Sequence, residues 1–458
     1  MIKFILNNQT IETELPIGTT VLDFVRYYKN LKGTKIGCRE GDCGACTILV
    51  GELKGDEVKY RTMTSCLMPI ANANGKHIVT VEGINKPNNE LTPVQQVMVD
   101  ESGTQCGFCT VGFVMSLTNF CLDDSAKTEE SAISAIDGNI CRCTGYKSIE
   151  RAASLLSGQC SLVSSQQNPL ECSIKNETVP KYFADIKERL ETLQTDQSQI
   201  PNSKSQIVAG GTDLYVQKHE EMVYAEATHV LFDDELRSIS KTDDFVELGA
   251  SVVVTDLLES EIFNRLFPNL YQHLKLVSST PIRNMATLAG NFVNASPIGD
   301  MTAFFLGLNA EIFFNTGRVL LLKDFYLGYK QLAKSEDEFI RTIRFSKDFT
   351  HFNFEKVCKR TYLDIASVNS AISLKIADKK IEQAHVSCGG VFATPLYLRK
   401  TSEFLQSKEI SNEIIGQANE ILQTEISPIS DVRGSAEYKR LLARQLFTAH
   451  FVELFGIG

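Results

Sequence analysis

Apolar and polar residues alternate with a period of two at the start of the chain. Ile2, Phe4 and Leu6 take the apolar positions, an Asn-Asn pair follows, and Ile11 resumes the alternation. Such alternation is typical of strands with one buried face, and the asparagines are suited to a turn. We therefore predict a hairpin at the start of the chain.

A helical period follows this hairpin. Thr19 or Thr20 can cap a helix whose apolar face carries Val21, Leu22, Phe24, Val25 and Tyr28. Further short strands are predicted at residues 47–50 and 78–82. The prediction for residues 1–84 is therefore one helix packed on a mixed sheet, in a β-grasp-like domain.

The period is that of helices from residue 85 onward. Thr92, Pro93 and Gln95 have the pattern of an N-cap, a first-turn proline and a capping-box partner. More helices are predicted at residues 111–121, 130–136 and 148–156. Because short loops join them, residues 85–158 are predicted to form a helical bundle.

The rest of the chain is predicted to follow a polar linker at residues 159–178, which is rich in Ser, Gln and Asn. Residues 179–346 mix strands and helices, and residues 350–458 begin with strands and end with helices near 411–423 and 435–455. The buried face of the last helix is predicted to comprise Leu441, Leu442, Leu446, Phe451, Leu454 and Phe455. The fold class is thus α+β, with several domains.

Charge and hydropathy narrow the classes of partner. The 458 residues carry a formal net charge of −10, and the pI is about 5.4. This acidity disfavours nucleic acid and anionic membranes as main partners. Since we find neither an apolar run of membrane-spanning length nor a signal-peptide pattern, we expect a cytoplasmic protein with no membrane partner.

Thirteen cysteines need a chemical explanation in a reducing compartment, and nine of them lie within the first 143 residues. Cys38, Cys43 and Cys46 have the spacing C-x4-C-x2-C, and Cys66 follows. This is the plant-type ferredoxin pattern for a [2Fe–2S] cluster. The alternatives are a zinc site with four cysteine ligands and thiols that bind no metal. Zinc favours two C-x2-C pairs, and only one is present.

A second group combines C-x2-C with C-x-C. Cys106 and Cys109 lie between predicted helices, as do Cys141 and Cys143. Two facing loops of this kind could hold a second [2Fe–2S] cluster, and two clusters together would conduct electrons. The other five cysteines are isolated in the sequence, and we interpret them as buried apolar residues or linker thiols: Cys121, Cys160, Cys172, Cys358 and Cys388.

A glycine pair suggests a nucleotide site. Gly210 and Gly211 follow the apolar end of a predicted strand, where their N–H groups could approach a pyrophosphate. Taken alone, this pair is weak support, because it is not the G-x-G-x-x-G of a Rossmann site. Residues 281–291 and 294–300 add small and polar side chains of the kind that line cofactor pockets.

Three segments resemble the paired-cluster domains of the xanthine dehydrogenase family of molybdenum hydroxylases: Gly37–Cys46, Gln105–Thr110 and Gly138–Tyr146. Val111 and the pair Lys147-Ser148 depart from the family pattern, but neither departure removes a ligand. The resemblance extends to about residue 455. It implies a ferredoxin-like domain, a helical [2Fe–2S] domain, a two-subdomain α/β FAD-binding domain similar to vanillyl-alcohol oxidase, and an α+β C-terminal flavoprotein domain.

The resemblance also implies roles for individual residues. Residues 207–214 would hold the FAD pyrophosphate, residues 287–291 would form a second wall, and Gln105 would approach the partner's pterin. Asp300, Val277 and Lys356 would lie near the flavin ring, and Ile340 near the nucleotide. The full set of implied FAD-binding residues is Ile207, Val208, Ala209, Gly210, Gly211, Thr212, Asp213, Leu214, Val277, Thr287, Leu288, Ala289, Gly290, Asn291, Asp300, Ile340 and Lys356.

The implied function is electron transfer. Electrons from xanthine or hypoxanthine hydroxylation at a partner's molybdenum cofactor would reach the Cys106 cluster, then the Cys38 cluster, then FAD, and finally NAD⁺ in a cleft beside the flavin. We expect the hydroxylation site, with its catalytic residues, in a large partner subunit, and two copies of each chain. The alternatives are the same role for an aldehyde, nicotinate or other N-heterocycle hydroxylase, or a zinc-binding structural or regulatory protein.

Overall fold

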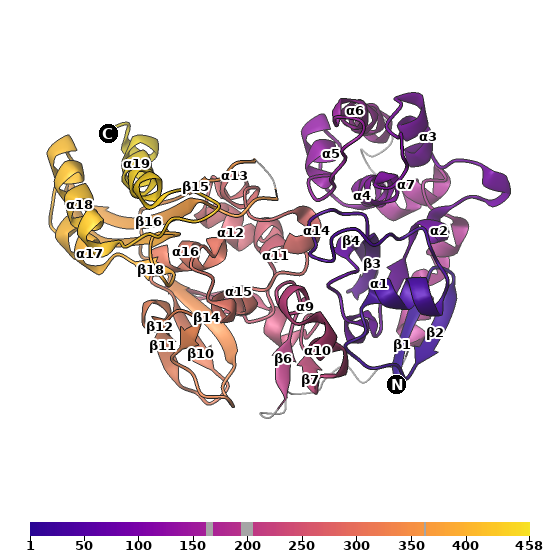
Figure 1. The fold of residues 1–458 in the computed structure, drawn as a ribbon, viewed down its shortest axis with the longest axis horizontal. Coiled ribbons are helices and arrows are strands. Elements are labelled where there is room, and N and C mark those ends of the chain that lie inside the picture. Colours follow the sequence, from indigo (N-terminus) through magenta and orange to yellow (C-terminus); the bar gives the residue numbers. More distant parts are fainter. Residues whose placement is uncertain (162–167, 194–204, 361–362) are drawn as a thin grey trace. The chain divides into compact units, whose positions relative to one another are not determined.

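The computed structural model describes residues 1–161, 168–193, 205–360 and 363–458. The chain forms two compact units (Figure 1). Unit 1 comprises Met1–Leu231 and Ser279–Met285, and unit 2 comprises Phe232–Ser278 and Ala286–Gly458. The boundary between the units crosses the domain predicted for residues 179–346, so this segment contributes to both.

Unit 1 begins with a five-stranded sheet in the order β2-β1-β5-β3-β4, in which β1 and β5 are parallel. Its strands are β1 Ile2–Leu6, β2 Gln9–Thr13, β3 Thr47–Lys54, β4 Glu57–Thr64 and β5 His77–Val79. The predicted hairpin is confirmed, and β4 was not predicted. The strand predicted to end at residue 82 stops at Val79, because helix α2 (Val81–Ile84) begins there.

The helix predicted after the hairpin is confirmed. Thr20 accepts a hydrogen bond from the Asp23 N–H and caps α1 (Val21–Asp23), which continues as a π-helical turn at Phe24–Tyr28. Val21 and Phe24 are buried. The apolar face of this short helix therefore provides the cover for the sheet that the β-grasp-like prediction requires.

The helical part of unit 1 follows the predicted pattern. Thr92 and Gln95 form the predicted capping box at the start of α3. One segment differs from the prediction: the polar residues assigned to a linker include a helix, α7, in which Cys172 and Ser173 are buried. The helices are α3 Pro93–Asp100, α4 Thr110–Leu122, α5 Glu129–Ala135, α6 Lys147–Ser161 and α7 Pro169–Lys175.

A small parallel pair of strands, β6 and β7, completes unit 1 together with short helices. These elements are α8 Ile186–Thr192, β6 Gln206–Val208, α9 Leu214–Gln217, α10 His219–Tyr224, β7 Ala227–His229 and α14 Thr280–Arg283. The predicted strand before the glycine pair is thus present, and the glycines lie in the loop between β6 and α9.

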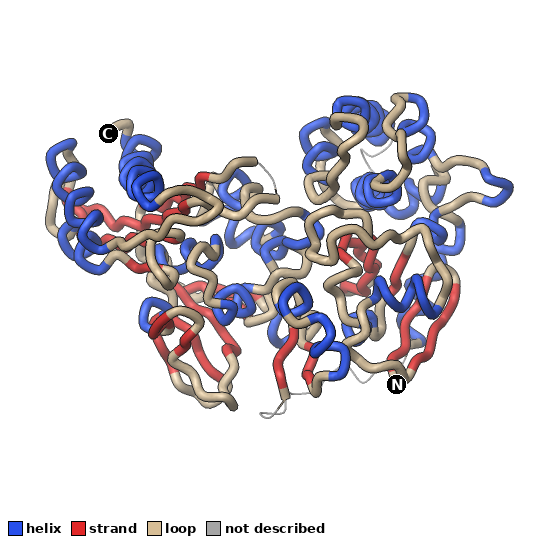
Figure 2. The backbone as a smooth tube through the Cα atoms, viewed as in Figure 1, coloured by secondary structure: helices blue, strands red, loops and turns tan. Residues whose placement is uncertain are grey.

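Unit 2 contains two larger sheets, drawn in red in Figure 2. The first has the order β11-β10-β14-β9-β8 and the second the order β15-β16-β17-β18. The first sheet and the β12–β13 hairpin comprise β8 Ile239–Lys241, β9 Phe245–Gly249, β10 Glu311–Phe314, β11 Val319–Leu321, β12 Tyr326–Gly328, β13 Gln331–Leu332 and β14 Ile340–Ser346. The second comprises β15 His351–Val357, β16 Val368–Ala377, β17 Lys380–Gly389 and β18 Leu396–Tyr397.

Helices pack against both sheets and bury two apolar cores, which include Phe304 and Phe305 in one and Phe447 in the other. The helices are α11 Val254–Glu259, α12 Glu261–Leu266, α13 Leu270–Leu274, α15 Leu288–Asn294, α16 Asp300–Gly307, α17 Arg399–Leu405, α18 Asn412–Glu425 and α19 Ala436–Phe455. The two terminal helices were predicted. Leu441 was wrongly placed on the buried face of α19, since its side chain is 52% exposed.

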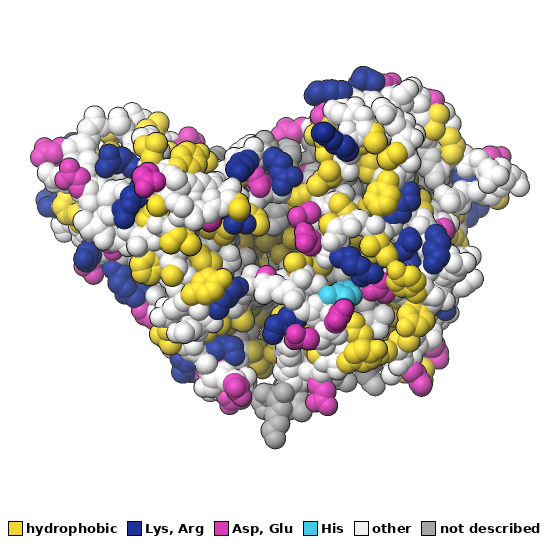
Figure 3. Space-filling model, viewed as in Figure 1, with side chains coloured by type: hydrophobic (Ala, Val, Ile, Leu, Met, Phe, Trp, Pro, Cys, Tyr) yellow, Lys and Arg dark blue, Asp and Glu magenta, His cyan; other side chains and the backbone are white. Residues whose placement is uncertain are grey.

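Charged side chains of both signs lie at the surface (Figure 3). On the face drawn in Figure 3, positive and negative side chains are interspersed. No helix in the described part of the chain is both long enough and apolar enough to cross a bilayer.

A buried ion pair ties the segment Ser279–Met285 to the helical part of unit 1. Arg283 Nη2 lies 2.6 Å from Asp137 Oδ2, and the exposed fractions of the two side chains are 5% and 0%. Asp137 also accepts the Thr280 N–H at 2.7 Å. Because these contacts join residues far apart in the sequence, they explain why this segment belongs to unit 1.

Replacing Arg283 with Met should therefore destabilise unit 1 strongly, because a buried carboxylate would lose its partner. We expect the free energy of unfolding to fall by about 3–5 kcal/mol. Arg151→Met, which breaks the exposed pair with Glu101, serves as the control and should cost no more than about 1 kcal/mol. Urea unfolding followed by circular dichroism measures both. Equal effects of the two variants would contradict the prediction.

Candidate iron–sulfur and flavin sites

The eight cysteines of the two predicted cluster motifs meet as four pairs. Cys106 and Cys143 Sγ lie 3.5 Å apart, and hydrogen-bonding contacts also join Cys38 to Cys43, Cys46 to Cys66, and Cys109 to Cys141. Among the described residues, no group of three or more His, Cys, Asp or Glu side chains is arranged to hold a single metal ion. A [2Fe–2S] cluster takes two protein ligands on each of its irons, so thiols in pairs suit it.

The loop that carries the first three cysteines depends on glycine. Gly41 and Gly44 have φ of 81° and 68°, which other residues rarely adopt. A Cβ at Gly37 would lie 2.5 Å from Cys43 Sγ. The loop also directs N–H groups at sulfur, because Glu40 and Cys43 donate to Cys38 Sγ at 3.3 and 3.4 Å. Such hydrogen bonds tune a bound cluster.

In the pairs Cys38–Cys43 and Cys46–Cys66, one thiol loses its proton more readily than the other. The hydrogen bond with Cys43 lowers the pKa of Cys38 to about 5 and raises the pKa of Cys43. The same kind of contact lowers the pKa of Cys46 and raises that of Cys66. In each pair, the thiol with the lowered pKa is the more readily ionised, and the thiolate is the form of cysteine that binds metal.

The second group of cysteines lies at the surface of unit 1. Cys106 and Cys143 are exposed, whereas Cys141 is buried. A hydrogen bond from the Phe108 N–H lowers the pKa of the Cys106 thiol, and burial raises the pKa of Cys109 to about 12. Gln105, Phe108 and Tyr146 beside them are exposed as well. One edge of this site is therefore open to a partner.

Backbone contacts join the two cysteine groups. The Ile140 N–H donates to the Cys43 carbonyl at 3.1 Å, and Ile140 is covalently bonded to Cys141. Asn139 Nδ2 donates to the Gly44 carbonyl at 3.2 Å. A Cβ at Gly112 would lie 2.1 Å from the same carbonyl oxygen. A path of one hydrogen bond and short covalent links therefore connects a ligand of one site to a ligand of the other.

The loop at Ala209–Asp213 is suited to a phosphate. Within the described residues, none of its five N–H groups donates a hydrogen bond to the protein. Gly211 has φ of 75°, and successive N–H groups in such turns form anion-binding concavities. Added Cβ atoms would lie 2.0 Å from the Met285 carbonyl oxygen at Gly210 and 2.6 Å from the Leu67 carbonyl oxygen at Gly211. Since Leu67 follows Cys66, this loop packs beside the first cysteine group.

Two buried side chains next to this loop have unsatisfied polar atoms. Tyr215 Oη and both ring nitrogens of His229 have no hydrogen-bond partner among the described residues. Burial lowers the pKa of His229 to about 4 and raises the pKa of Tyr215. Buried polar groups are usually paired, so these atoms are available for a ligand. Sequence reasoning missed both, although Tyr215 directly follows the predicted motif at 207–214.

Unit 2 brings together Asp300 and Lys356, two of the predicted flavin-site residues. Lys356 Nζ donates to Asp300 Oδ2 at 2.7 Å and to the carbonyls of Leu276 and Asp364 at 2.6 and 2.8 Å. All three of its protons thus have acceptors. Asn369 Nδ2 donates to the other Asp300 oxygen at 2.7 Å. Contact of Lys356 with a flavin would require the loss of one of these bonds.

The other residues of unit 2 that were predicted to bind FAD lie either in an apolar core or at the start of helix α15. Val277, Leu288 and Ile340 belong to one apolar core. Thr287 caps α15 by accepting the Gly290 N–H, and Asn291 Oδ1 accepts from Thr302 N and Oγ1. Ala289 is partly buried, and Gly290 is exposed. Their roles toward FAD remain predictions.

Four family models match successive parts of the chain. Residues 4–71 match a 2Fe-2S iron-sulfur cluster binding domain, and residues 80–154 match a [2Fe-2S] binding domain. Residues 180–346 match the FAD binding domain in molybdopterin dehydrogenase. Residues 354–454 match the CO dehydrogenase flavoprotein C-terminal domain. These matches confirm the predicted α+β multidomain fold.

Known proteins with this arrangement are similar in sequence. Xanthine dehydrogenase 1 of Arabidopsis thaliana is 26% identical over 96% of this chain and 38% of its own length. Aldehyde oxidase 2 of Macaca fascicularis is 25% identical over 99% of this chain and 39% of its own length. The chain thus spans less than half the length of these relatives.

A solved carbon monoxide dehydrogenase from Hydrogenophaga pseudoflava shares the fold. It is 24% identical, covers 55% of this chain and 89% of its own, and has a TM-score of 0.51. Taken together, these matches show two [2Fe-2S] domains, an FAD-binding domain and a flavoprotein C-terminal domain, an arrangement similar to the iron–sulfur and FAD region of molybdenum hydroxylases.

Proposed function

We propose that this chain is the electron-transfer subunit of a xanthine dehydrogenase, carrying electrons from a partner's molybdenum centre to NAD⁺. The observation that carries the proposal is the pairing of eight thiols in two joined sites, Cys38, Cys43, Cys46 and Cys66, and Cys106, Cys109, Cys141 and Cys143. When bound, the clusters move single electrons, and FAD exchanges electrons singly or as a hydride.

The order of the sites in unit 1 supports a direction of transfer. Cys106 and Cys143 are exposed, so a donor can approach their cluster. The hydrogen bond from the Ile140 N–H to the Cys43 carbonyl connects this group to the Cys38 group. The phosphate-binding loop follows, because Gly211 packs against Leu67. This arrangement suits a route from a docked partner through both sites to a flavin.

The chain's own residues bind and orient in this proposal. The thiolates hold iron, and the N–H groups of the Cys38 loop bond to sulfur. The N–H groups at 209–213 bind the FAD pyrophosphate, with Tyr215 and His229 as additional donors. In unit 2, Asp300 and Lys356 form a buried ion pair, and their role toward the flavin ring stays a prediction.

The substrate distinguishes the two leading candidates. The relatives include xanthine dehydrogenases and an aldehyde oxidase at similar identity. We favour xanthine or hypoxanthine because xanthine dehydrogenases of several organisms match more than 90% of this chain. We further propose a large molybdenum-cofactor-binding partner, two copies of each chain, and a cytoplasmic location. Turnover of the purified complex with xanthine but not with benzaldehyde supports this candidate, and the reverse result favours an aldehyde hydroxylase.

The composition of the purified protein tests the cofactors first. Two [2Fe–2S] clusters and one FAD predict about four iron atoms per flavin. NADH should bleach the flavin absorbance, because hydride transfer is reversible at this site. Elemental analysis and visible spectroscopy measure both. Zinc in place of iron, or absence of flavin, would favour the structural zinc-binding alternative.

Replacing Cys143 with Ser should interrupt entry of electrons from the partner. We expect substrate-dependent NAD⁺ reduction by the complex to fall by at least roughly 10–100-fold, since even the loss of a group that hydrogen-bonds to a metal ligand costs this much. NADH oxidation by an artificial dye should persist, because it needs only the flavin. Cys358→Ser, at a half-buried cysteine outside the motifs, is the matched control. If dye reduction disappears in a variant that retains FAD, the proposed order is wrong.

Replacing Tyr215 with Phe tests whether this residue binds FAD. FAD affinity is expected to fall, whereas the stability of the apoprotein is expected to stay the same or rise. If Oη binds FAD, the dissociation constant of FAD should rise by roughly 10–100-fold, as for a hydrogen bond to a charged group. The apoprotein should be as stable or more stable, because an unsatisfied buried hydroxyl is removed. Isothermal titration of apoprotein with FAD and thermal unfolding give the two values. Unchanged affinity would remove Tyr215 from the site.

A further inference from the structure

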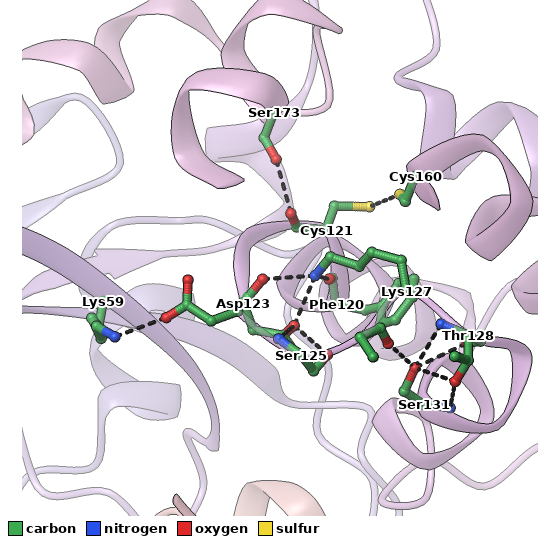
Figure 4. A network of polar contacts seen from close by, with 12 residues as sticks. Lys59, Phe120, Cys121, Asp123, Ser125, Lys127, Thr128, Ser131, Cys160 and Ser173 are labelled. Atoms are coloured by element: carbon green, nitrogen blue, oxygen red, sulfur yellow. Dashed lines mark hydrogen bonds and ion pairs between the residues drawn. The ribbon is translucent and has the colours of Figure 1, made fainter. Parts of the chain in front are cut away.

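Three cysteines outside the cluster motifs surround one small cavity of unit 1. Cys121 lies at the end of α4, Cys160 at the end of α6 and Cys172 in α7. These cysteines are isolated in the sequence, and Cys121 is buried in an apolar core as expected. The fold nevertheless assembles a thiol pair from separate helices, because Cys121 Sγ and Cys160 Sγ are 3.3 Å apart (Figure 4).

The cavity is small and partly charged. Its volume is about 30 Å³, and its lining includes the three cysteines, Lys127 and Ser173. This is room for about two water-sized groups. The Lys127 ammonium is held at this site by the Phe120 and Asp123 carbonyls and by Asp123 Oδ1 at 2.9 Å (Figure 4). A fixed cation thus lies beside a pair of thiols.

The two thiols differ in reactivity. The hydrogen bond with Cys121 lowers the pKa of Cys160, and this effect outweighs burial, which raises it; the charges of Lys127 and Asp123 act in opposite directions. The same hydrogen bond raises the pKa of Cys121, which is almost fully buried. Cys160 is half-buried and so more accessible. Thiolate character and access make Cys160 the nucleophile, while Cys121 keeps its proton.

We propose that Cys160 and Cys121 form a peroxide-reactive dithiol, which closes reversibly to a disulfide between the ends of α4 and α6. A cavity of this size admits hydrogen peroxide but excludes a bulky oxidant such as glutathione disulfide. Cys172 lines the cavity without reacting, because the Cys121 sulfur is already in contact with Cys160.

The chemistry balances as a two-electron oxidation. The Cys160 thiolate attacks one peroxide oxygen, the O–O bond breaks, and Cys160 becomes a sulfenic acid while hydroxide leaves. That hydroxide takes the Cys121 proton and becomes water. The Cys121 thiolate then attacks the Cys160 sulfur, the S–O bond breaks, and a second hydroxide leaves and is protonated by solvent. Overall, two thiols are oxidised to a disulfide and one peroxide is reduced to two waters.

The position of this pair gives the disulfide a structural consequence. Cys109 is the N-cap residue of α4, and Cys141 and Cys143 shortly precede α6. The bond would therefore fasten the far ends of the two helices whose near ends carry the second cysteine group. We expect the oxidised form to melt roughly 5–15 °C higher than the reduced form, as for other disulfides in units of this size.

The test uses the full-length reduced protein with its cofactors. We expect hydrogen peroxide to produce a peptide cross-linked between Cys121 and Cys160, detected by mass spectrometry after alkylation and reversed by dithiothreitol. Oxidation of this pair should be roughly tenfold or more faster than oxidation of Cys358, the half-buried control outside the cavity. Glutathione disulfide at the same concentration should leave the pair reduced.

Single variants make the assignment specific. In Cys121→Ser, Cys160 should stop at the sulfenic acid and be trapped by dimedone. In Cys172→Ser, the cross-link should form as in the unaltered protein. The proposal is overturned if Cys160 gives no dimedone adduct in Cys121→Ser, if both thiols stay reduced at peroxide concentrations that bleach the clusters, or if glutathione disulfide oxidises them equally fast.

Discussion

The rest of unit 1 depends on the close approach of two backbones at the cysteine loops. Gly44 and Gly112 allow this approach, since a Cβ at either position would lie 2.3 or 2.1 Å from a carbonyl oxygen. The Ile140 N–H then reaches the Cys43 carbonyl. Through this contact, a ferredoxin-like sheet and a helical bundle become one structure in which the two predicted cluster sites are adjacent.

The backbone is packed just as closely at the loop Ala209–Asp213. Gly210 and Gly211 lie against the carbonyls of Met285 and Leu67, and Leu67 follows a cluster ligand. The buried Asp137–Arg283 pair brings the segment with Met285 into unit 1. Predicted metal ligands, predicted phosphate-binding N–H groups and a structural ion pair are thus neighbours in unit 1.

The polar and charged groups of the two units differ in whether the protein supplies their hydrogen-bond partners. In unit 1, one thiol of each of the pairs Cys38–Cys43 and Cys46–Cys66 has a lowered pKa, and polar atoms of Tyr215 and His229 without a hydrogen-bond partner among the described residues lie beside the loop. In unit 2, Lys356 and Asp300 satisfy each other within a buried network. The polar groups of unit 1 can therefore still bind a ligand, whereas Lys356 and Asp300 in unit 2 already bind each other.

The sequence by itself determined the features that short segments encode. The Cys38–Cys46 spacing, the Thr92 capping box and the glycine pair at 210–211 depend on neighbouring residues, so their local geometry follows from their order. Only the tertiary structure decided the pairing of thiols, the burial of Lys356, the exposure of Leu441 and the contact of Cys121 with Cys160, 39 residues away. These features depend on which helices and strands pack together. Packing brings together residues that are far apart in the sequence, and nothing in their order along the chain indicates that they will meet.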